Sequence, residues 1–164
     1  DVSGHGIGAA ILMTAALTHL KTMLRTSGDP AAAAVATNNY LVEHSSARMF
    51  TTLWVGVFDS RSGSLRYVDA GHGHWLICRS DAPPSAPPAP GGVLAGIRTG
   101  IAYSVEEIDF DCGDRLVLYS DGLVEQSGPG LERFESERLF EVLARSGSIG
   151  QDVAMSFEAL GAFA

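Results

Sequence analysis

The chain has 164 residues, of which 46% are hydrophobic and 18% charged, a composition that fits one globular domain. Its 11 basic and 19 acidic residues give a formal net charge of −8, so a nucleic acid partner is not expected, because phosphate backbones would on average be repelled. No uninterrupted run of about 18 apolar residues and no signal peptide occur, so we expect no membrane segment. Cys78 and Cys112 are expected to be free thiols in the cytoplasm, since nothing in the sequence supports a disulfide.

Two helices are predicted at the start of the chain. Residues 7–26 follow a glycine-containing turn, and apolar residues at spacings of 3 and 4 line one face: Ala10, Met13, Leu17, Leu20 and Leu24. Gly28 is typical of a helix end, and Asp29-Pro30 is typical of a helix start, with Asp29 as the cap. The second helix is therefore predicted to run from there to about Ser45.

Strands are predicted for the middle of the chain and helices for its end. The predicted strands cover residues 51–58, 64–70, 74–79, 101–110 and 115–119. Arg61-Ser62-Gly63 joins the first two as a hairpin, and the proline-rich residues 81–92 form a loop. Residues 132–145 form an amphipathic helix, and Ser148 with Gln151 matches a capping box for a last helix. This order favours an α+β fold with antiparallel strand pairing.

Two acidic loops are candidates for metal binding. The sequence DVSGHG at residues 1–6 directly precedes the first helix, and YSDG at 119–122 follows a short apolar strand. Asp1 and Asp121 thus each lie at the tip of a regular element beside a flexible turn, which suits a hard divalent cation. Such cations favour phosphate chemistry, because they neutralise oxygen charge and activate water. Either aspartate taken alone could equally be a turn or helix-cap residue.

Four stretches of sequence occur in an order that is typical of one enzyme family. They are DVSGHGIGAAILM at residues 1–13, MFTTLWVG at 49–56, DAGH at 69–72 and GDRLVLYSDGLVE at 113–125. Together they resemble the motifs of the SpoIIE/RsbU group of metal-dependent serine/threonine phosphatases, which are bacterial PPM-type relatives of protein phosphatase 2C. The resemblance covers residues 1 to about 145, and the last stretch is the most specific.

The resemblance implies a fold and a domain. The family fold has two antiparallel sheets sandwiched between helical layers, in the order α-β-β-α. The family also places an acidic motif and a strand before the stretch that begins at Asp1, and a further acidic motif and strand after Ala164. Residues 1–164 are therefore expected to be a partial PPM-type phosphatase domain, incomplete at both termini and inactive by itself.

The resemblance also implies roles for individual residues. Asp1 would bridge two Mn²⁺ or Mg²⁺ ions, Val2 would contribute its backbone carbonyl, and Asp121 would be a second carboxylate ligand. His72 would order a turn by hydrogen bonding. Asp152 is not expected to replace the missing terminal ligand, because the residues after it have helical periodicity.

The implied function is hydrolysis of phosphoserine or phosphothreonine on a regulatory protein. In this family the substrate is commonly an anti-sigma-factor antagonist with the STAS fold, and an upstream sensor domain is an accompanying expectation. The alternative is a non-catalytic pseudophosphatase or partner-binding regulatory module, because this chain supplies only two of the four expected carboxylates.

Overall fold

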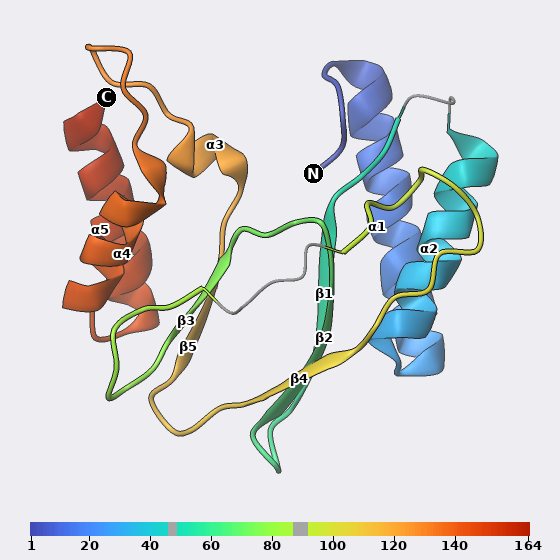
Figure 1. Ribbon diagram of the computed structural model, residues 1–164, viewed down its shortest axis with the longest axis horizontal. Helices are drawn as coiled ribbons and strands as arrows, with labels where there is room; N and C mark the ends of the chain where they lie inside the picture. The colour runs from blue at the N-terminus through green and yellow to red at the C-terminus, as the bar shows by residue number, and fades with distance from the viewer. Residues whose placement is uncertain (46–48, 87–91) are drawn as a thin grey trace. The chain divides into compact units, whose positions relative to one another are not determined.

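The computed structural model describes residues 1–45, 49–86 and 92–164 of the chain (Figure 1). They form two compact units, and each is described by itself. The first unit contains Asp1–Gly73 and Ala89–Asp109, and the second contains His74–Pro88 and Phe110–Ala164.

The first unit begins with two packed helices, α1 (Ile7–Ser27) and α2 (Pro30–His44). Gly28 ends α1 in the left-handed conformation, with φ of 66°, and its N–H donates to the Leu24 carbonyl at 2.8 Å. The Asp29 side chain accepts from the Ala31 N–H at 3.2 Å, and Pro30 occupies the first helical position. Both predicted helices and the cap between them are therefore confirmed.

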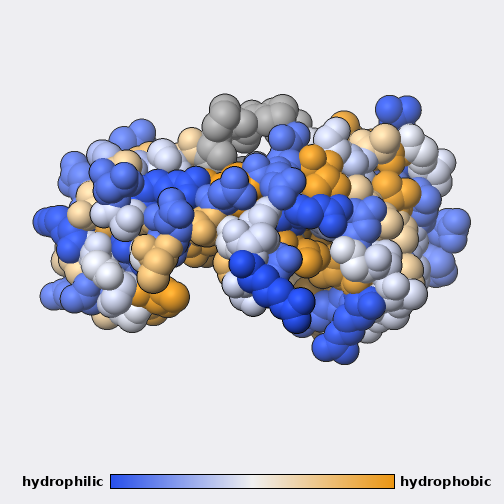
Figure 2. All heavy atoms as spheres, turned by 90° about the horizontal axis from the view of Figure 1, so that it is seen from below, coloured by the Kyte–Doolittle hydropathy of each residue, from blue (hydrophilic) through white to orange (hydrophobic). Residues whose placement is uncertain are grey.

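The face that α1 buries matches the predicted one only in part, because Leu20 and Leu24 pack against the core of the unit as predicted. Leu12 and Ala16 are buried in the core of the unit, whereas Met13 is 50% exposed and Leu17 is 47% exposed. Apolar residues occur on more than one side of this helix, so periodicity alone selects no single face. The choice is made by packing against α2 and the rest of the core of the unit. Figure 2 shows hydrophobic residues at the surface of the molecule, between hydrophilic ones.

The sequence predicts no membrane segment in residues 1–164, and helix α1 is the element that tests this prediction. Among the described residues, it is the one helix that is long and apolar enough to cross a membrane, with a mean hydropathy of 1.4 over 18 residues. A core helix of a globular protein or a signal sequence can pass the same test, so this is weak evidence for a membrane span. Leu12 and Ala16 pack into the core, so α1 contributes side chains to the core of this unit.

The sheet of the first unit is antiparallel, with strand order β1-β2-β4. The hairpin β1 (Leu53–Asp59) and β2 (Ser64–Ala70) turns at Gly63, whose φ is 74°, as predicted. Strand β4 (Glu106–Asp109) pairs with the start of β2 and covers only the last part of the predicted strand 101–110. Before it, Ile101 and Tyr103 lie in the hydrophobic core outside the ladder, and burial raises the pKa of Tyr103 to about 12.

The second unit pairs β3 (Trp75–Cys78) with β5 (Arg115–Leu118) in an antiparallel sheet. Its helices are α3 (Asp121–Val124), α4 (Glu135–Arg145) and α5 (Ile149–Phe163). Its core consists of Leu76, Cys78, Phe134, Leu139 and Leu143. Both cysteines are free; Cys78 is buried and Cys112 is exposed. Helices with two antiparallel sheets confirm the predicted α+β class.

The predicted capping box of α5 forms in a modified way. The Ser148 hydroxyl accepts from the Gln151 N–H at 3.4 Å, as in a standard box. The Gln151 side chain accepts from the N–H of Gly147 at 2.8 Å instead of from that of Ser148. The helix therefore starts where the sequence predicted, because the cap is a local signal.

Candidate metal centre

The segment that carries Asp1 is held in an extended conformation by residues that lie just before β1. The Asp1 nitrogen donates to the Thr52 carbonyl at 3.0 Å, and the Thr52 N–H donates to the Asp1 carbonyl at 2.8 Å. The Ser3 N–H donates to the Phe50 carbonyl at 2.8 Å, and the Ser3 hydroxyl accepts from the Phe50 N–H at 2.8 Å. These hydrogen bonds fix the backbone of Asp1 in the first unit.

Val2 lies between these two hydrogen-bonded pairs, in an antiparallel bridge opposite Thr51. In such a ladder, the intervening residue directs its own N–H and C=O away from the partner strand. The Val2 carbonyl therefore points to the side opposite Thr51. A backbone carbonyl in that position is a ligand that a hard cation accepts.

The Asp1 carboxylate lies beside His72. The Oδ2 atom of Asp1 is 3.6 Å from Nδ1 of His72; the Asp1 side chain is 45% exposed and that of His72 is 13% exposed. His72 belongs to the D-A-G-H turn, which begins with the last two residues of β2, and its N–H donates to Asp69 Oδ1 at 2.7 Å. The N–H of Gly73 donates to Asp69 Oδ2 at 3.1 Å, so Asp69 closes the turn. The turn-ordering hydrogen bond is thus made by the His72 backbone, and the imidazole lies beside the Asp1 carboxylate.

Asp121 is the first residue of α3, a single helical turn at a position where the sequence predicts a loop. Its side chain is exposed, and its carbonyl accepts from the Glu125 N–H at 2.8 Å. Beneath it, Val124 is buried and Leu123 packs against the core of the second unit. The carboxylate is therefore presented at the surface by a short turn that packing holds in place.

His74 supports the Asp121 loop, although no motif in the sequence indicates such a role for it. Its ring meets that of Tyr119 edge-on, with centroids 5.4 Å apart, and its carbonyl accepts from the Tyr119 N–H at 3.1 Å. Since Tyr119 is two residues before Asp121, His74 steadies the approach to that loop within the second unit. The side chain of Glu125 pairs with Arg133 at 2.6 Å, at a distance that fits a surface ion pair.

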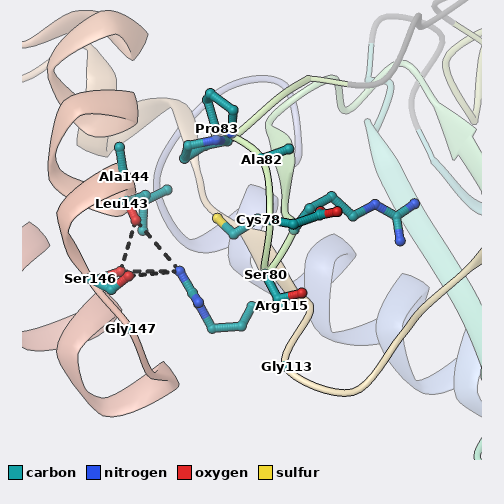
Figure 3. A pocket seen from close by; sticks show the side chains of 13 residues that line it. Cys78, Ser80, Ala82, Pro83, Gly113, Arg115, Leu143, Ala144, Ser146 and Gly147 are labelled. Atoms are coloured by element: carbon teal, nitrogen blue, oxygen red, sulfur yellow. Dashed lines mark hydrogen bonds between the residues drawn. The ribbon is translucent and has the colours of Figure 1, made fainter.

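Asp152 has a structural partner and lies in α5, as its helical context predicted. Its Oδ2 accepts from Arg115 Nε at 2.8 Å, and both side chains are almost fully buried. Figure 3 shows Arg115 reaching toward Leu143 and Ser146, whose carbonyl accepts from it at 3.2 Å. The Ser146 hydroxyl also hydrogen bonds to Asp152. This network joins β5 to the turn between α4 and α5.

The network lies on the wall of a cavity of about 600 Å³ in the second unit. Two arginines line this cavity, but Arg115 is paired with Asp152, and Arg79 is paired with Asp114 at 2.6 Å. The cavity therefore presents no surplus positive charge to a phosphate group. Its polar residues stabilise the fold of the unit.

Asp114 stands at the base of β5, with only 2% of its side chain exposed. It accepts hydrogen bonds from Arg79 and from the backbone N–H groups of Ser80 and Asp111. Burial raises the pKa of the Asp114 carboxyl, but these hydrogen bonds and the Arg79 charge outweigh burial, so the pKa lies below its usual 3.8. Asp114 is thus a buried anchor for the strand that leads to Asp121.

The structure brings Asp1, Val2 and His72 together in the first unit and presents Asp121 in the second. Within residues 1–45, 49–86 and 92–164, no group of three or more His, Cys, Asp and Glu side chains is placed to hold a metal ion. The donors themselves fit a hard divalent cation, because they are two exposed carboxylates and an outward-directed carbonyl. These residues would form part of a ligand set.

Solved structures share this fold over almost the whole chain. The RsbU and RsbW domains of Rv1364c from Mycobacterium tuberculosis superpose with a TM-score of 0.80 at 27% identity, over 98% of this chain and 45% of that one. The PP2C phosphatase domain of SpoIIE from Bacillus subtilis, with a fragment of its regulatory domain, gives 0.80 at 20% identity, over 100% of this chain and 48% of that one. The architecture is therefore that of a PP2C-type, or PPM, phosphatase domain.

The sequence comparison gives the family. The model of Stage II sporulation protein E (SpoIIE) matches residues 1–162, and the chain therefore belongs to the SpoIIE family. Protein IcfG from Synechocystis is 30% identical over 118 residues, which cover 71% of this chain and 18% of IcfG. The chain thus spans less than a fifth of that curated relative and just under half of the two solved chains.

Proposed function

We propose that this chain is part of a metal-dependent protein serine/threonine phosphatase. The observation that carries the proposal is the Asp1 segment, in which a half-exposed carboxylate and an outward-directed carbonyl are fixed by backbone hydrogen bonds. That segment opens a sequence that matches the SpoIIE family over residues 1–162. The reaction proposed is hydrolysis of a phosphoserine or phosphothreonine ester on another protein.

In this proposal, Asp1, Val2 and Asp121 would hold two divalent cations, Mn²⁺ or Mg²⁺. Such cations, when bound, neutralise phosphate oxygens and activate water for in-line attack. Asp1 and Asp121 contribute the negative charge that retains them, and the Val2 carbonyl contributes a neutral oxygen. The family pattern assigns the remaining carboxylates to the acidic motifs that flank this stretch in its relatives. Residues 1–164 alone should therefore be inactive.

The proposed substrate is a phosphorylated regulatory protein, with a STAS-type anti-sigma-factor antagonist as the specific candidate. Membership of the SpoIIE family supports this choice at the level of the family. The net charge of −8 is consistent with a protein substrate and unfavourable for a nucleic acid one. The reaction is proposed to take place in the cytoplasm, under the control of an upstream sensor domain.

A second candidate function is a pseudophosphatase or a partner-binding regulatory module. The observation that favours it is the lack of a cluster of three or more ligand side chains among the described residues. Both candidates share the fold, and they differ in whether a complete ligand set retains metal and supports turnover.

Phosphate release by the full-length protein separates the two. The substrate is a STAS-type protein phosphorylated on serine, with Mn²⁺ or Mg²⁺ present and EDTA as the control. Phosphate release that requires the cation supports the phosphatase. Release that survives EDTA, or none with any phosphoserine or phosphothreonine protein tested, would leave the binding module or an unrelated chemistry.

A further inference from the structure

A short hairpin follows α3 in the second unit. Its two arms, within residues 126–134, meet in an antiparallel bridge. The Gly128 N–H donates to the Glu132 carbonyl at 2.8 Å, and the Leu131 N–H donates to the Gly128 carbonyl at 3.0 Å. Residues 129–131 therefore form a three-residue hairpin loop, and Leu131 is its last residue.

Leucine is an unfavourable residue for this position. The last residue of such a loop takes the left-handed conformation, which glycine adopts most easily, and Leu131 has a φ of 65°. A leucine pays for this conformation, because its Cβ comes close to the carbonyl oxygen that follows. Its side chain is also 87% exposed, so packing within the unit does not offset that cost. The fold of the unit thus gives no reason for an apolar side chain here.

The hairpin that carries Leu131 is held firmly. The Glu132 carboxylate lies against the loop backbone, where a Cβ at Gly130 would overlap it. A Cβ at Gly128 would come within 3.1 Å of the Phe163 ring, which packs against the core of the unit. A leucine on a fixed loop loses little conformational entropy when it binds a partner, which favours its use as an anchor.

The hairpin is also connected to the turn that carries Asp121. The Glu125 N–H donates to the Asp121 carbonyl at 2.8 Å, and the Glu125 carboxylate pairs with Arg133 of the hairpin at 2.6 Å. Figure 1 shows the hairpin and α3 at the same end of the second unit. A folded protein that brings a phosphorylated residue to Asp121 would therefore also present neighbouring surface to Leu131.

The charges around the hairpin restrict what can bind there. Residues 125–138 contain four acidic and two basic side chains, namely Glu125, Glu132, Glu135, Glu137, Arg133 and Arg138. A complementary surface has an apolar hollow with a basic rim. An anionic lipid surface is disfavoured by this charge, and so is a second copy of a chain with a net charge of −8.

We propose that Leu131 is a docking residue, which inserts into an apolar hollow on the phosphorylated protein substrate. This inference rests on the proposed function, because it takes the partner to be the substrate that Asp121 serves. It deepens that function by making the substrate a folded protein that is recognised away from its phosphate group. Leu131 then determines affinity for the whole protein and has no effect on small phosphate esters.

Three substitutions in the full-length protein test this role. Leu131→Asn removes the apolar side chain and keeps a residue that tolerates the left-handed conformation. Leu131→Met keeps an apolar side chain of similar volume. Ile149→Asn, at the exposed first residue of α5, is the matched control.

Each variant is measured in three ways. The first is kcat and KM with a serine-phosphorylated STAS-type protein and with p-nitrophenyl phosphate, in Mn²⁺. The second is the dissociation constant of the phosphorylated STAS-type protein in EDTA, by calorimetry. The third is the unfolding midpoint in EDTA.

We expect Leu131→Asn to raise the KM and the dissociation constant of the phosphorylated protein by about 10–100-fold, as for a buried leucine that is lost. The rate with p-nitrophenyl phosphate should be unchanged, and the unfolding midpoint should be no lower than that of the wild type. Leu131→Met should restore most of the affinity, and Ile149→Asn should match the wild type.

Four results would overturn the role. The first is an unchanged affinity in Leu131→Asn. The second is a loss of affinity that comes with a lowered unfolding midpoint or an equal loss with p-nitrophenyl phosphate, because the hairpin would then only support α3. The third is an equal loss in Ile149→Asn or in Leu131→Met. The fourth is self-association of the wild type that Leu131→Asn abolishes, because the partner would then be a second copy.

The wild-type protein distinguishes failure of this inference from failure of the proposed function. Wild type that binds the phosphorylated protein and hydrolyses neither substrate would end the phosphatase proposal, and the affinities of the Leu131 variants would still decide the docking role. Wild type that hydrolyses p-nitrophenyl phosphate only with Mn²⁺, and does not bind the phosphorylated protein, would end the docking role alone. Wild type that does neither would end both.

Discussion

The two candidate metal-binding aspartates are supported in different ways. Asp1 is fixed by hydrogen bonds to Thr52, 51 positions away, and its carboxylate meets His72 after the second strand. Asp121 is fixed by hydrogen bonds within its own helical turn and by the packing of Leu123 and Val124 beneath it. The first aspartate therefore depends on distant parts of its unit, and the second depends on its immediate neighbours and on the strand before it.

The long-range contacts that support Asp121 are made at the start of β5, the strand that precedes it. Strand β5 begins at Arg115, which is paired with Asp152. The residue directly before the strand, Asp114, is paired with Arg79. The loop at the C-terminal end of β5 is thus anchored through ion pairs at the N-terminal end. Changes to these pairs should disturb the second unit, while changes to the D-A-G-H turn should disturb the first.

The largest expected effect comes from breaking the buried pair of the second unit. Arg115→Met removes the cation that Asp152 contacts and leaves a buried carboxylate unpaired, which should cost about 3–5 kcal/mol. In the full-length protein, the amides of β5 and α5 should exchange hydrogen about 10²–10³-fold faster, as measured by mass spectrometry.

Two further variants check that interpretation of Arg115. Arg145→Met, at an exposed arginine in the last turn of α4, should change stability by no more than about 0.5 kcal/mol. The double variant Arg115→Met/Asp152→Leu should be less damaging than Arg115→Met alone, because no charge is left buried. Equal exchange rates in Arg115→Met and the wild type would show that the pair does not anchor β5.

The next effect is on turnover and should leave the fold intact. Asp121→Asn keeps the shape of an exposed side chain and removes its charge, so metal retention and kcat should fall. A loss of about 10²-fold or more in kcat corresponds to about 2.7 kcal/mol of transition-state stabilisation. Phosphate release from the phosphorylated STAS-type substrate measures it.

The matched control for this substitution is Asp81→Asn, at an exposed aspartate of the same unit. It changes the net charge by the same amount, and its rate should equal that of the wild type. Full activity in Asp121→Asn would remove this residue from the metal site. Equal losses in both variants would indicate a general effect of charge.

Local signals in the sequence were sufficient to predict where helices begin, but they were insufficient to predict which side chains of those helices contact other elements. The Asp29 cap and the Ser148 cap act within a few residues, so both helix starts could be predicted. The buried face of α1 could be predicted only in part, because Met13 and Leu17 are as apolar as the Leu12 that packs inward. Periodicity cannot choose between two apolar sides of a helix when the neighbouring elements are unknown.

The candidate site shows the same division between local and distant information. Asp1 and Asp121 were selected because each lies in a motif at the tip of a regular element. The contact of His72 with Asp1 depends on how the turn after β2 folds back, and no spacing in the sequence encodes it. The same holds for the Arg115–Asp152 pair, which joins a strand to a helix far along the chain.

A smaller effect should follow from changing the turn that carries His72. Gly71→Ala places a Cβ on a residue with φ of 79°, against the Leu94 side chain, and should cost about 1–3 kcal/mol. Denaturant unfolding of the variant and the wild type measures this loss of stability.

Gly150→Ala is the control for this substitution. Gly150 lies in the first turn of α5, with open space where a Cβ would be. Alanine there should be neutral or stabilise by about 0.5–1 kcal/mol, because glycine is the poorer helix former. If Gly71→Ala behaves like Gly150→Ala, the turn is more adaptable than its backbone conformation indicates.

The smallest expected effect is a dependence of stability on pH, through Asp114. Its pKa is lower in the folded protein than the usual 3.8, so the unfolded chain binds a proton more readily. The stabilisation that this carboxylate contributes is therefore complete above about pH 4, and it is lost as the pH falls through the lowered pKa of the folded state.

Asp114→Asn should be less stable than the wild type by about 1–2 kcal/mol at neutral pH, because a hydrogen bond to a charged partner is lost. The difference should shrink as the pH falls below about 4, where the unfolded wild-type chain takes up a proton at Asp114 before the folded protein does. Urea midpoints of unfolding between pH 2.5 and 7 measure this difference in stability. The control variant Asp81→Asn should differ from the wild type by the same amount at every pH. A difference for Asp114→Asn that is the same at pH 3 and pH 7 would show that Asp114 anchors β5 through its shape and backbone hydrogen bonds, and not through its charge.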